Sequence, residues 1–206
     1  MPRRPTKQSV HLVVDATGVK VYGEGEWKVR QQHGYSKRRT WRKLHFAVDE
    51  ARLEFVAVTV STDNFKDSPL LPDLLEQVGN AISQVSAGGD YDTRTCYTAL
   101  HERGARAVIP PRRGARIWQH ANTRGERHNS RDENLRAIRR RGRAAWKRES
   151  DYHQRSLAET QVMRVKTIFG ERVSARSFDA QAAQLLIRCA ALNRMTHLGM
   201  PNSYPV

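Results

Sequence analysis

Short runs of apolar residues along the chain predict the strands of a sheet. Val10–Val14 is the first run, and Leu44–Val48 and Phe55–Val60 follow, separated from each other by a short polar segment. Because these last two runs consist mainly of β-branched or other apolar residues and are separated by a short polar segment, the pattern predicts an antiparallel hairpin. Ile82–Val85 and Ala107–Ile109 predict two further strands.

Longer segments with helical start and stop signals alternate with those strands. The predicted helices cover Asp67–Val78, Thr93–Arg103, residues 151–169 and Ala180–Leu198. Gly104 and Gly199 directly follow two of them, at the position where glycine commonly ends a helix. The order of elements predicts an α/β fold with a mixed sheet flanked by helices, antiparallel in one half and parallel in the other. It is similar to the order of a ribonuclease-H-like domain.

Residues 112–148 differ from the rest of the chain in composition. They hold 13 Arg or Lys residues against 3 acidic ones, and so carry +10 of the net charge of +15. Apolar residues are sparse there, so we expect a solvated or DNA-facing insertion, or a disordered basic loop, and no core element. The predicted organisation is a basic tail (1–9), one ribonuclease-H-like domain (10–198) containing this insertion, and a C-terminal tail (199–206).

The charge of the chain indicates an acidic partner. Its 206 residues suffice for one sizeable domain, and 36 Lys and Arg against 21 Asp and Glu favour nucleic acid, with a structural ribonucleoprotein component as an alternative. Cys96 and Cys189 lack metal-ligand spacing, so we expect buried free thiols. No apolar run approaches the ~18 residues of a membrane span, and Met1–Val10 lacks the apolar segment of a signal peptide. We expect a cytoplasmic protein, at the nucleoid.

Four polar residues near the end of the chain share one predicted helical face. At about 100° per residue, Tyr152, Arg155, Glu159 and Lys166 fall within an arc of about 60°. Such a face does not build a core and is typical of a site for a metal ion and a phosphate. Asp15 follows the first predicted strand and supplies a second carboxylate.

Asp90 adds a third carboxylate after the fourth predicted strand, behind Gly88-Gly89. Phosphodiester cleavage commonly uses two divalent ions about 3.5–4 Å apart, and Mg²⁺ prefers carboxylate and water oxygens. Asp15, Asp90 and Glu159 are therefore the candidate catalytic and metal-binding residues, with Mg²⁺, or Mn²⁺ as a substitute. Taken singly, each has another interpretation: a turn or cap residue for the two aspartates, and a surface charge for Glu159.

Six segments, which follow one another along the chain in the order of the family's motifs, resemble a bacterial insertion-sequence transposase of the Asp-Asp-Glu class. The long motif is Tyr-x2-Arg-x3-Glu-x6-Lys (152–166), and the shorter matches are residues 13–23, 41–45, 91–93, 109–112 and 191–195. The resemblance implies a ribonuclease-H-like fold, Mg²⁺ dependence, and cleavage and strand transfer on double-stranded DNA at the ends of a mobile element. It also implies DNA contacts by Tyr152, Arg155 and Lys166.

The chain departs from this family in two places. Relatives usually carry Asp-Gly-Ala-Tyr-Asp around the second acid, and an ungapped count places Gly88 at that position. Asp90 lies two residues further, about 6–7 Å along an extended chain; we nevertheless expect it to be the second acid. Relatives also carry a helical DNA-end-binding region ahead of the first acid, whereas 14 residues precede Asp15 here. Either a separate polypeptide supplies that region, or the chain is a truncated remnant that only binds DNA.

The remaining basic clusters are predicted to position DNA, since phosphate contacts supply most of the affinity. The predicted contacts are Arg38, Arg39, Arg112 and Arg113, with Arg139–Arg141 and Arg143 as a further cluster. Trp118 and Trp146 lie inside the basic insertion, where stacking on an unpaired base and packing in a small satellite core are the two alternatives, the second being favoured.

Pairing of two element ends makes a homodimer plausible.

Overall fold

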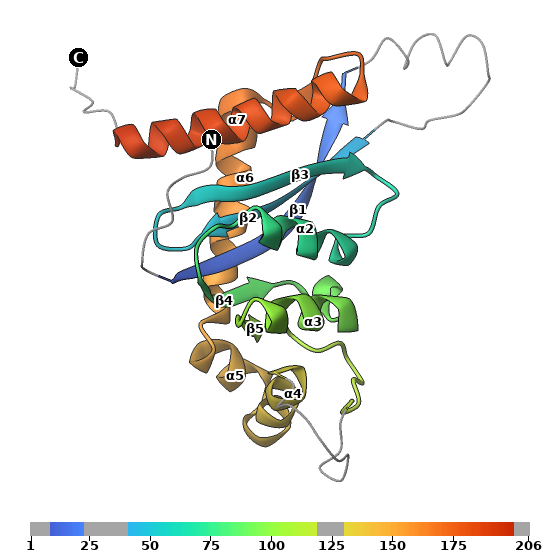
Figure 1. The fold of residues 1–206 in the computed structure, drawn as a ribbon, viewed down its shortest axis with the longest axis vertical. Coiled ribbons are helices and arrows are strands. Elements are labelled where there is room, and N and C mark those ends of the chain that lie inside the picture. The colour runs from blue at the N-terminus through green and yellow to red at the C-terminus, as the bar shows by residue number, and fades with distance from the viewer. Residues whose placement is uncertain (1–8, 23–40, 119–129, 200–206) are drawn as a thin grey trace.

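One mixed sheet forms the centre of the molecule in the computed structural model, which describes residues 9–22, 41–118 and 130–199 (Figure 1). The described strands are β1 (Val10–Val21), β2 (Trp41–Asp49), β3 (Glu54–Thr62), β4 (Ile82–Ala87), β5 (Arg106–Val108) and β6 (Arg172–Val173). The strand order is β3-β2-β1-β4-β5, and β6 pairs with β1 beyond the end of β4. β1, β2 and β3 are antiparallel neighbours, whereas β1, β4 and β5 run parallel. The predicted division of the sheet into two halves is confirmed.

Helices and short 3-10 turns connect and cover the strands. They are η1 (Ser68–Leu70), α2 (Leu71–Glu76), η2 (Gly89–Tyr91), α3 (Arg94–Glu102), α4 (Ser130–Arg141), α5 (Arg143–Glu149), η3 (Tyr152–Arg155), α6 (Ser156–Phe169) and α7 (Phe178–Leu198). Thr93 caps α3 by accepting a hydrogen bond from the backbone N–H of Cys96, and Ser177 caps α7. Gly104 and Gly199 have positive φ where these helices end, as the sequence predicts.

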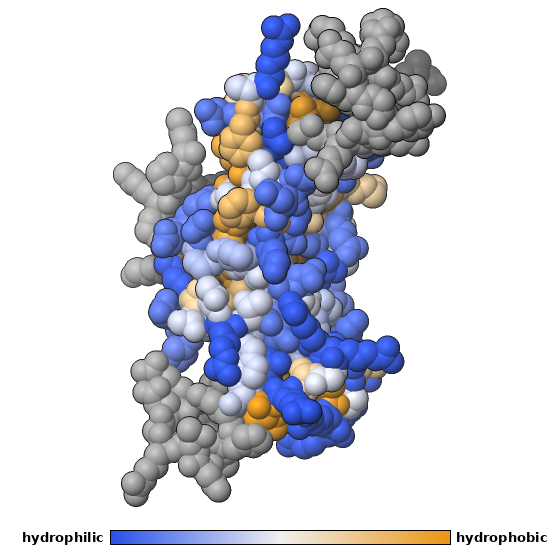
Figure 2. Space-filling view, turned by 90° about the vertical axis from the view of Figure 1, so that its right-hand side faces the viewer, coloured by the Kyte–Doolittle hydropathy of each residue, from blue (hydrophilic) through white to orange (hydrophobic). Residues whose placement is uncertain are grey.

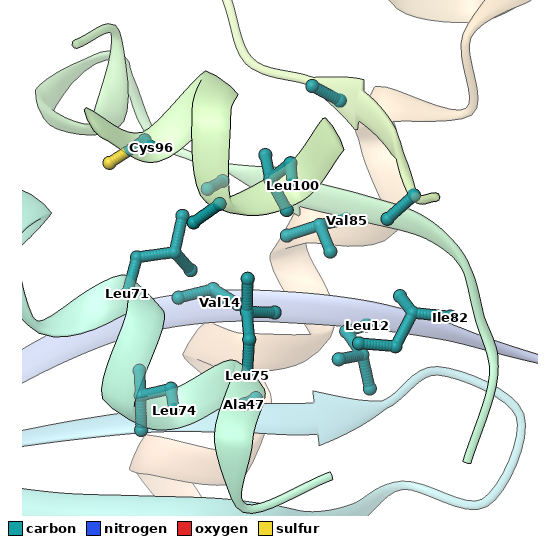
Figure 3. Packing of buried hydrophobic residues seen from close by; sticks show 14 of the residues in the cluster. Leu12, Val14, Ala47, Leu71, Leu74, Leu75, Ile82, Val85, Cys96 and Leu100 are labelled. Carbon is teal, nitrogen blue, oxygen red and sulfur yellow. The ribbon is translucent and has the colours of Figure 1, made fainter. Parts of the chain in front are cut away.

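Alternation along β1 divides its side chains between two hydrophobic clusters. Leu12 and Val14 face α2 and α3, and the cluster on that side includes Leu71, Leu75 and Leu100 (Figure 3). Successive residues of a strand point to opposite faces, so Val13 lies on the other side. Both faces of the central strand are therefore buried, which explains its nearly continuous apolar sequence.

The second cluster lies between the sheet and the helices α6 and α7, which cross the face opposite to α2 and α3 (Figure 1). Val13 and Phe46 from the sheet pack there with Val165 of α6 and Leu185 and Leu192 of α7. Asp15 is two residues after Val13 on the same strand, so its side chain belongs to this face. The location of α6 therefore decides what Asp15 meets.

Two elements differ in length from the prediction. The sequence predicts that the first strand ends at Val14 and that Thr17-Gly18 forms a turn, but β1 continues to Val21 and includes both residues. Gly18 pairs with Lys43, and a Cβ at Gly18 would approach the Trp41 ring to 3.2 Å, so the close packing of Trp41 explains the glycine. The helix predicted over Asp67–Val78 is only η1 and α2, which begins at Leu71 and ends at Glu76.

The expectation that the basic insertion contributes no core element is wrong for its described part. α4 and α5 pack against β5, and Trp146 and Ala137 form a third cluster with Val108. Asn134 donates to the carbonyl of Ala107 and accepts from the indole N–H of Trp146. This confirms the satellite-core alternative for Trp146.

Both cysteines are buried free thiols, as expected. In the described ranges, no helix combines the length and apolar character that crossing a membrane requires.

Candidate active site

Asp15 lies in the middle of β1 and not at a strand end, because β2 pairs with β1 on both sides of it. On its other edge, β1 pairs with β4 only as far as Val14, opposite Ala87, and with β6 only from Lys20. The stretch from Asp15 to Val19 therefore has no β4 or β6 partner among the described strands. This gap in the sheet gives solvent access to the strand that carries Asp15.

Arg155 joins the two carboxylates that the sequence predicts to converge. One terminal nitrogen of its guanidinium donates to Asp15 Oδ2 at 2.9 Å, and the other donates to Glu159 Oε1 at 2.9 Å. Asp15 and Arg155 are 140 residues apart in sequence. The fold thus assembles three of the predicted site residues into one ion-paired group.

The four motif residues do not lie on one regular α-helix. Tyr152 and Arg155 belong to the 3-10 turn η3, which follows Asp151 in the left-handed conformation, and α6 begins at Ser156. A 3-10 turn has three residues per turn, so the stripe predicted at 100° per residue does not extend to them. The Tyr152 ring instead packs on Trp146, with ring centroids 5.6 Å apart.

A cavity of about 450 Å³ opens beside Asp15 and Glu159. Lys166, seven residues after Glu159 on α6, also lines it, as do Thr17 on β1 and Met163 on α6. Residues seven apart on a helix share a face, which explains why Glu159 and Lys166 reach the same space. The cavity therefore combines an ammonium group with two carboxylates.

Burial dominates the electrostatics of Asp15. It raises the pKa of the Asp15 carboxyl above its usual value of 3.8, although the Arg155 guanidinium and the backbone N–H of Ala16 lower it. The nearby carboxylate of Glu159 also raises the pKa of Asp15. A second cation near Asp15 would be favourable, because it would relieve both effects.

Asp90 does not reach this group. It is exposed on η2 and is not among the residues that line the cavity. Gly88 follows Ala87, which pairs with Val14, and a Cβ on Gly88 would be 3.7 Å from Nε of Arg155. The ungapped position of the motif is therefore adjacent to the arginine that joins the two carboxylates.

The carboxylates present fit one divalent ion better than two. Mg²⁺ is commonly held by one or two carboxylates, with water and substrate oxygens completing its coordination. Asp15 and Glu159 supply such a pair. Among the described residues no three His, Cys, Asp or Glu side chains gather closely enough to bind a metal together. A site for two ions would need a further ligand.

The other predicted DNA contacts lie outside this group. Arg112 and Arg113 are exposed on the segment after β5, whereas Arg38 and Arg39 fall outside the described residues. Sequence reasoning missed the role of Asp92, which is buried and accepts a hydrogen bond from Nε of Arg131 at 2.6 Å. The sequence suggests for Asp92 only a role as a cap of the following helix, and no pattern in the sequence pairs it with an arginine of the insertion.

A family model described as "Transposase DDE domain" matches residues 6–194. The match covers nearly the whole chain, including the sheet, the carboxylate pair, α6 and most of α7. The strand order, and the convergence of Asp15 and Glu159 on Arg155, agree with the ribonuclease-H-like fold that the sequence resemblance implies. The chain therefore belongs to the family of transposase DDE domains.

Proposed function

We propose that this chain cleaves DNA strands and joins them at the ends of a mobile element, in a reaction that depends on a divalent metal ion. The observation that carries the proposal is the convergence of Asp15 and Glu159 on Arg155, at a cavity lined by Asp15–Thr17 of β1 and by residues of α6. The two carboxylates come from distant parts of the sequence. Members of this family generally use divalent ions, in keeping with such a pair.

Each residue of the group has a separate role in the proposal. Asp15 and Glu159 would hold an Mg²⁺ or Mn²⁺ ion, which when bound supplies charge neutralisation at phosphorus and activates a water molecule or a hydroxyl group. Lys166 lines the same cavity and is placed to neutralise a phosphate oxygen of the substrate. The burial of Asp15 strengthens its interaction with any cation that enters.

The helices α4 and α5 supply a second basic surface for DNA. A cavity of about 660 Å³ lies between them and β5, and four arginines line it, Arg106, Arg136, Arg140 and Arg141. Glu133 and Glu149 line it too, so the surface is not uniformly basic. We assign it phosphate contacts that position DNA and do not select its sequence.

The proposal is tested by nicking of supercoiled plasmid DNA with Mg²⁺ or Mn²⁺. The parent should nick, and Asp15→Ala or Glu159→Ala should remove most of the activity. Glu76→Ala is the matched control, because Glu76 is an exposed acid on α2, on the opposite face of the sheet. If both site variants nick as well as the parent, the site is assigned wrongly.

Asp90→Ala decides whether Asp90 is the second acid. Its loss should abolish nicking if the η2 turn rearranges to bring Asp90 to the metal when DNA binds. Retained nicking would show that Asp15 and Glu159 suffice, and would remove Asp90 from the site.

Binding of DNA without cleavage is a second candidate function. The observation that favours it is Gly88, which places no carboxylate beside Asp15 and Glu159, while Asp90 remains outside the cavity. This function predicts salt-sensitive DNA binding by the parent and no nicking with either metal. Nicking that requires Asp15 and Glu159 would exclude it.

A further inference from the structure

The guanidinium of Arg155 occupies both carboxylates of the pair at once. Its two terminal nitrogens bind Asp15 Oδ2 and Glu159 Oε1, each at 2.9 Å. These oxygens belong to the same two side chains that would ligate a metal ion. A guanidinium and a divalent ion are both cations seeking carboxylate oxygens, so they cannot both use this pair fully.

Of the three guanidinium nitrogens of Arg155, the two terminal ones donate hydrogen bonds to acceptors in the described part of the chain. Its Nε is buried and has no hydrogen-bond partner among the described residues. Gly88 is one place from which a third partner could come, because a Cβ added there would lie 3.7 Å from that Nε and 3.9 Å from a terminal nitrogen. Gly88 has φ −68° and ψ 167°, a conformation open to any residue, so the backbone does not require glycine there.

Two features of this arrangement favour the displacement of Arg155. A buried donor without a partner is unfavourable. The Glu159 side chain is 63% exposed, so water screens its pair with Arg155. The Asp15 side of the contact is more enclosed, with side-chain exposures of 27% for Arg155 and 22% for Asp15. Asp15 is therefore the stronger anchor.

We propose that Arg155 is the resident counter-cation of the Asp15–Glu159 pair, and that it is exchanged for a divalent ion when its guanidinium moves to a DNA phosphate. Arg155 is thus a positioning residue that keeps the two carboxylates together in the free chain. DNA supplies the alternative partner, because phosphate binds guanidinium through the same forked geometry as carboxylate. This inference rests on the proposed metal-binding role of Asp15 and Glu159, but not on cleavage.

Calorimetric titration of Mn²⁺ into the DNA-free chain tests the competition. Because a neighbouring arginine changes the affinity of a carboxylate for a proton about tenfold or more, Arg155→Gln should bind Mn²⁺ about tenfold more tightly than the parent. Arg155→Lys keeps the charge without the fork and should fall between them. Arg164→Gln is the control, because Arg164 also lies on α6 but contacts Gln161 and Thr196.

Thermal unfolding of each variant, followed by circular dichroism, establishes that the proteins compared are folded. Folded Arg155→Gln and Arg155→Lys variants that bind Mn²⁺ no more tightly than the parent would overturn the competition. Failure of the parent to nick DNA would leave this result standing, because the measured quantity is metal affinity.

The exchange itself is tested by repeating the titration with a short DNA duplex present. Phosphate oxygens of the DNA can become ligands of the ion in every variant. The quantity compared is therefore the increase in Mn²⁺ affinity that DNA causes in each variant. The gain in Mn²⁺ affinity on adding DNA should be larger for the parent than for Arg155→Gln, because only the parent has a guanidinium to transfer. Equal gains would contradict the exchange.

Discussion

At the scale of single residues, His45 is a buried group with one satisfied nitrogen. Its side chain is fully buried on β2, where Nε2 lies 2.8 Å from the Ser61 hydroxyl. Its Nδ1 has no hydrogen-bond partner in the described part of the chain and lies 3.6 Å from Oδ1 of Asp67. Burial lowers the pKa of His45 below 6.5, more strongly than the Asp67 carboxylate raises it.

A lowered histidine pKa makes folding stability depend on pH in a definite direction. Near pH 6 the unfolded chain binds more protons than the folded chain, so the free energy of unfolding should be at its full value above about pH 6.5 and fall as the pH falls below it. Urea unfolding at about pH 7.5 and about pH 5.5 should show this loss, which His45→Gln should reduce. His153→Gln, an exposed control on η3, should not. An equal loss of unfolding free energy in His45→Gln and in the parent would exclude His45 as the source. Burial also lowers the pKa of His11, which therefore contributes to the loss in the same direction.

The convergence of Asp15 and Glu159 could be predicted from sequence, because strand order and motif spacing both bring them to one place. The hydrogen-bond partners of the polar side chains in this site could not be predicted. The left-handed backbone at Asp151 starts η3, and this local change rotates Tyr152 away from the stripe that periodicity predicts. Whether Gly88 or Asp90 lies next to the carboxylate pair depends on the residue at which β4 ends, which is Ala87. A pattern of apolar residues does not define the last residue of a strand.

At the scale of elements, one buried ion pair joins the basic insertion to the rest of the domain. Arg131 on α4 binds Asp92, which follows η2, and its guanidinium lies 3.8 Å from the centre of the Trp118 ring. Removing one partner of a buried pair leaves an uncompensated charge, so Arg131→Met should lower the free energy of unfolding by about 3–5 kcal/mol. Chemical denaturation measures this, with Arg140→Met, an exposed substitution on the same helix, as the control. A loss no larger than that of the control would show that α4 is held mainly by Trp146 and its neighbours.

The same pair explains why α4 and α5 were not predicted. Sequence patterns detect a helix through a periodic apolar face, and α4 buries Asp132 and Asn134 as well as Leu135. Its packing uses charged and aromatic side chains instead of a wide apolar stripe. By contrast, α7 ends at Leu198 before Gly199, as the sequence predicts, since local chemistry decides a helix end; it begins at Phe178, two residues before the predicted start.

At the scale of the whole molecule, the net charge of +15 is spread unevenly. Figure 2 shows a face covered mainly by hydrophilic side chains, which gather most strongly at the level of α4 and α5, with hydrophobic groups in small patches. The elements that carry the carboxylate pair, β1 and α6, lie between α4 and α5 at one end of the molecule and α7 at the other (Figure 1). DNA that contacts α4 and α5 through its backbone could therefore extend toward the cavity of Asp15 and Lys166.

This arrangement predicts a steep dependence of DNA affinity on salt. Each phosphate that the protein neutralises releases counterions and contributes about −0.9 to the slope of log K against log salt for duplex DNA. Arg136→Gln and Arg140→Gln should each make the slope shallower by about 1 and weaken binding to unrelated sequences to a similar extent. Arg52→Gln, in the turn between β2 and β3, should leave the slope unchanged. Fluorescence anisotropy with two unrelated duplexes over a salt series measures both quantities. An unchanged slope in both variants would show that DNA does not lie along α4.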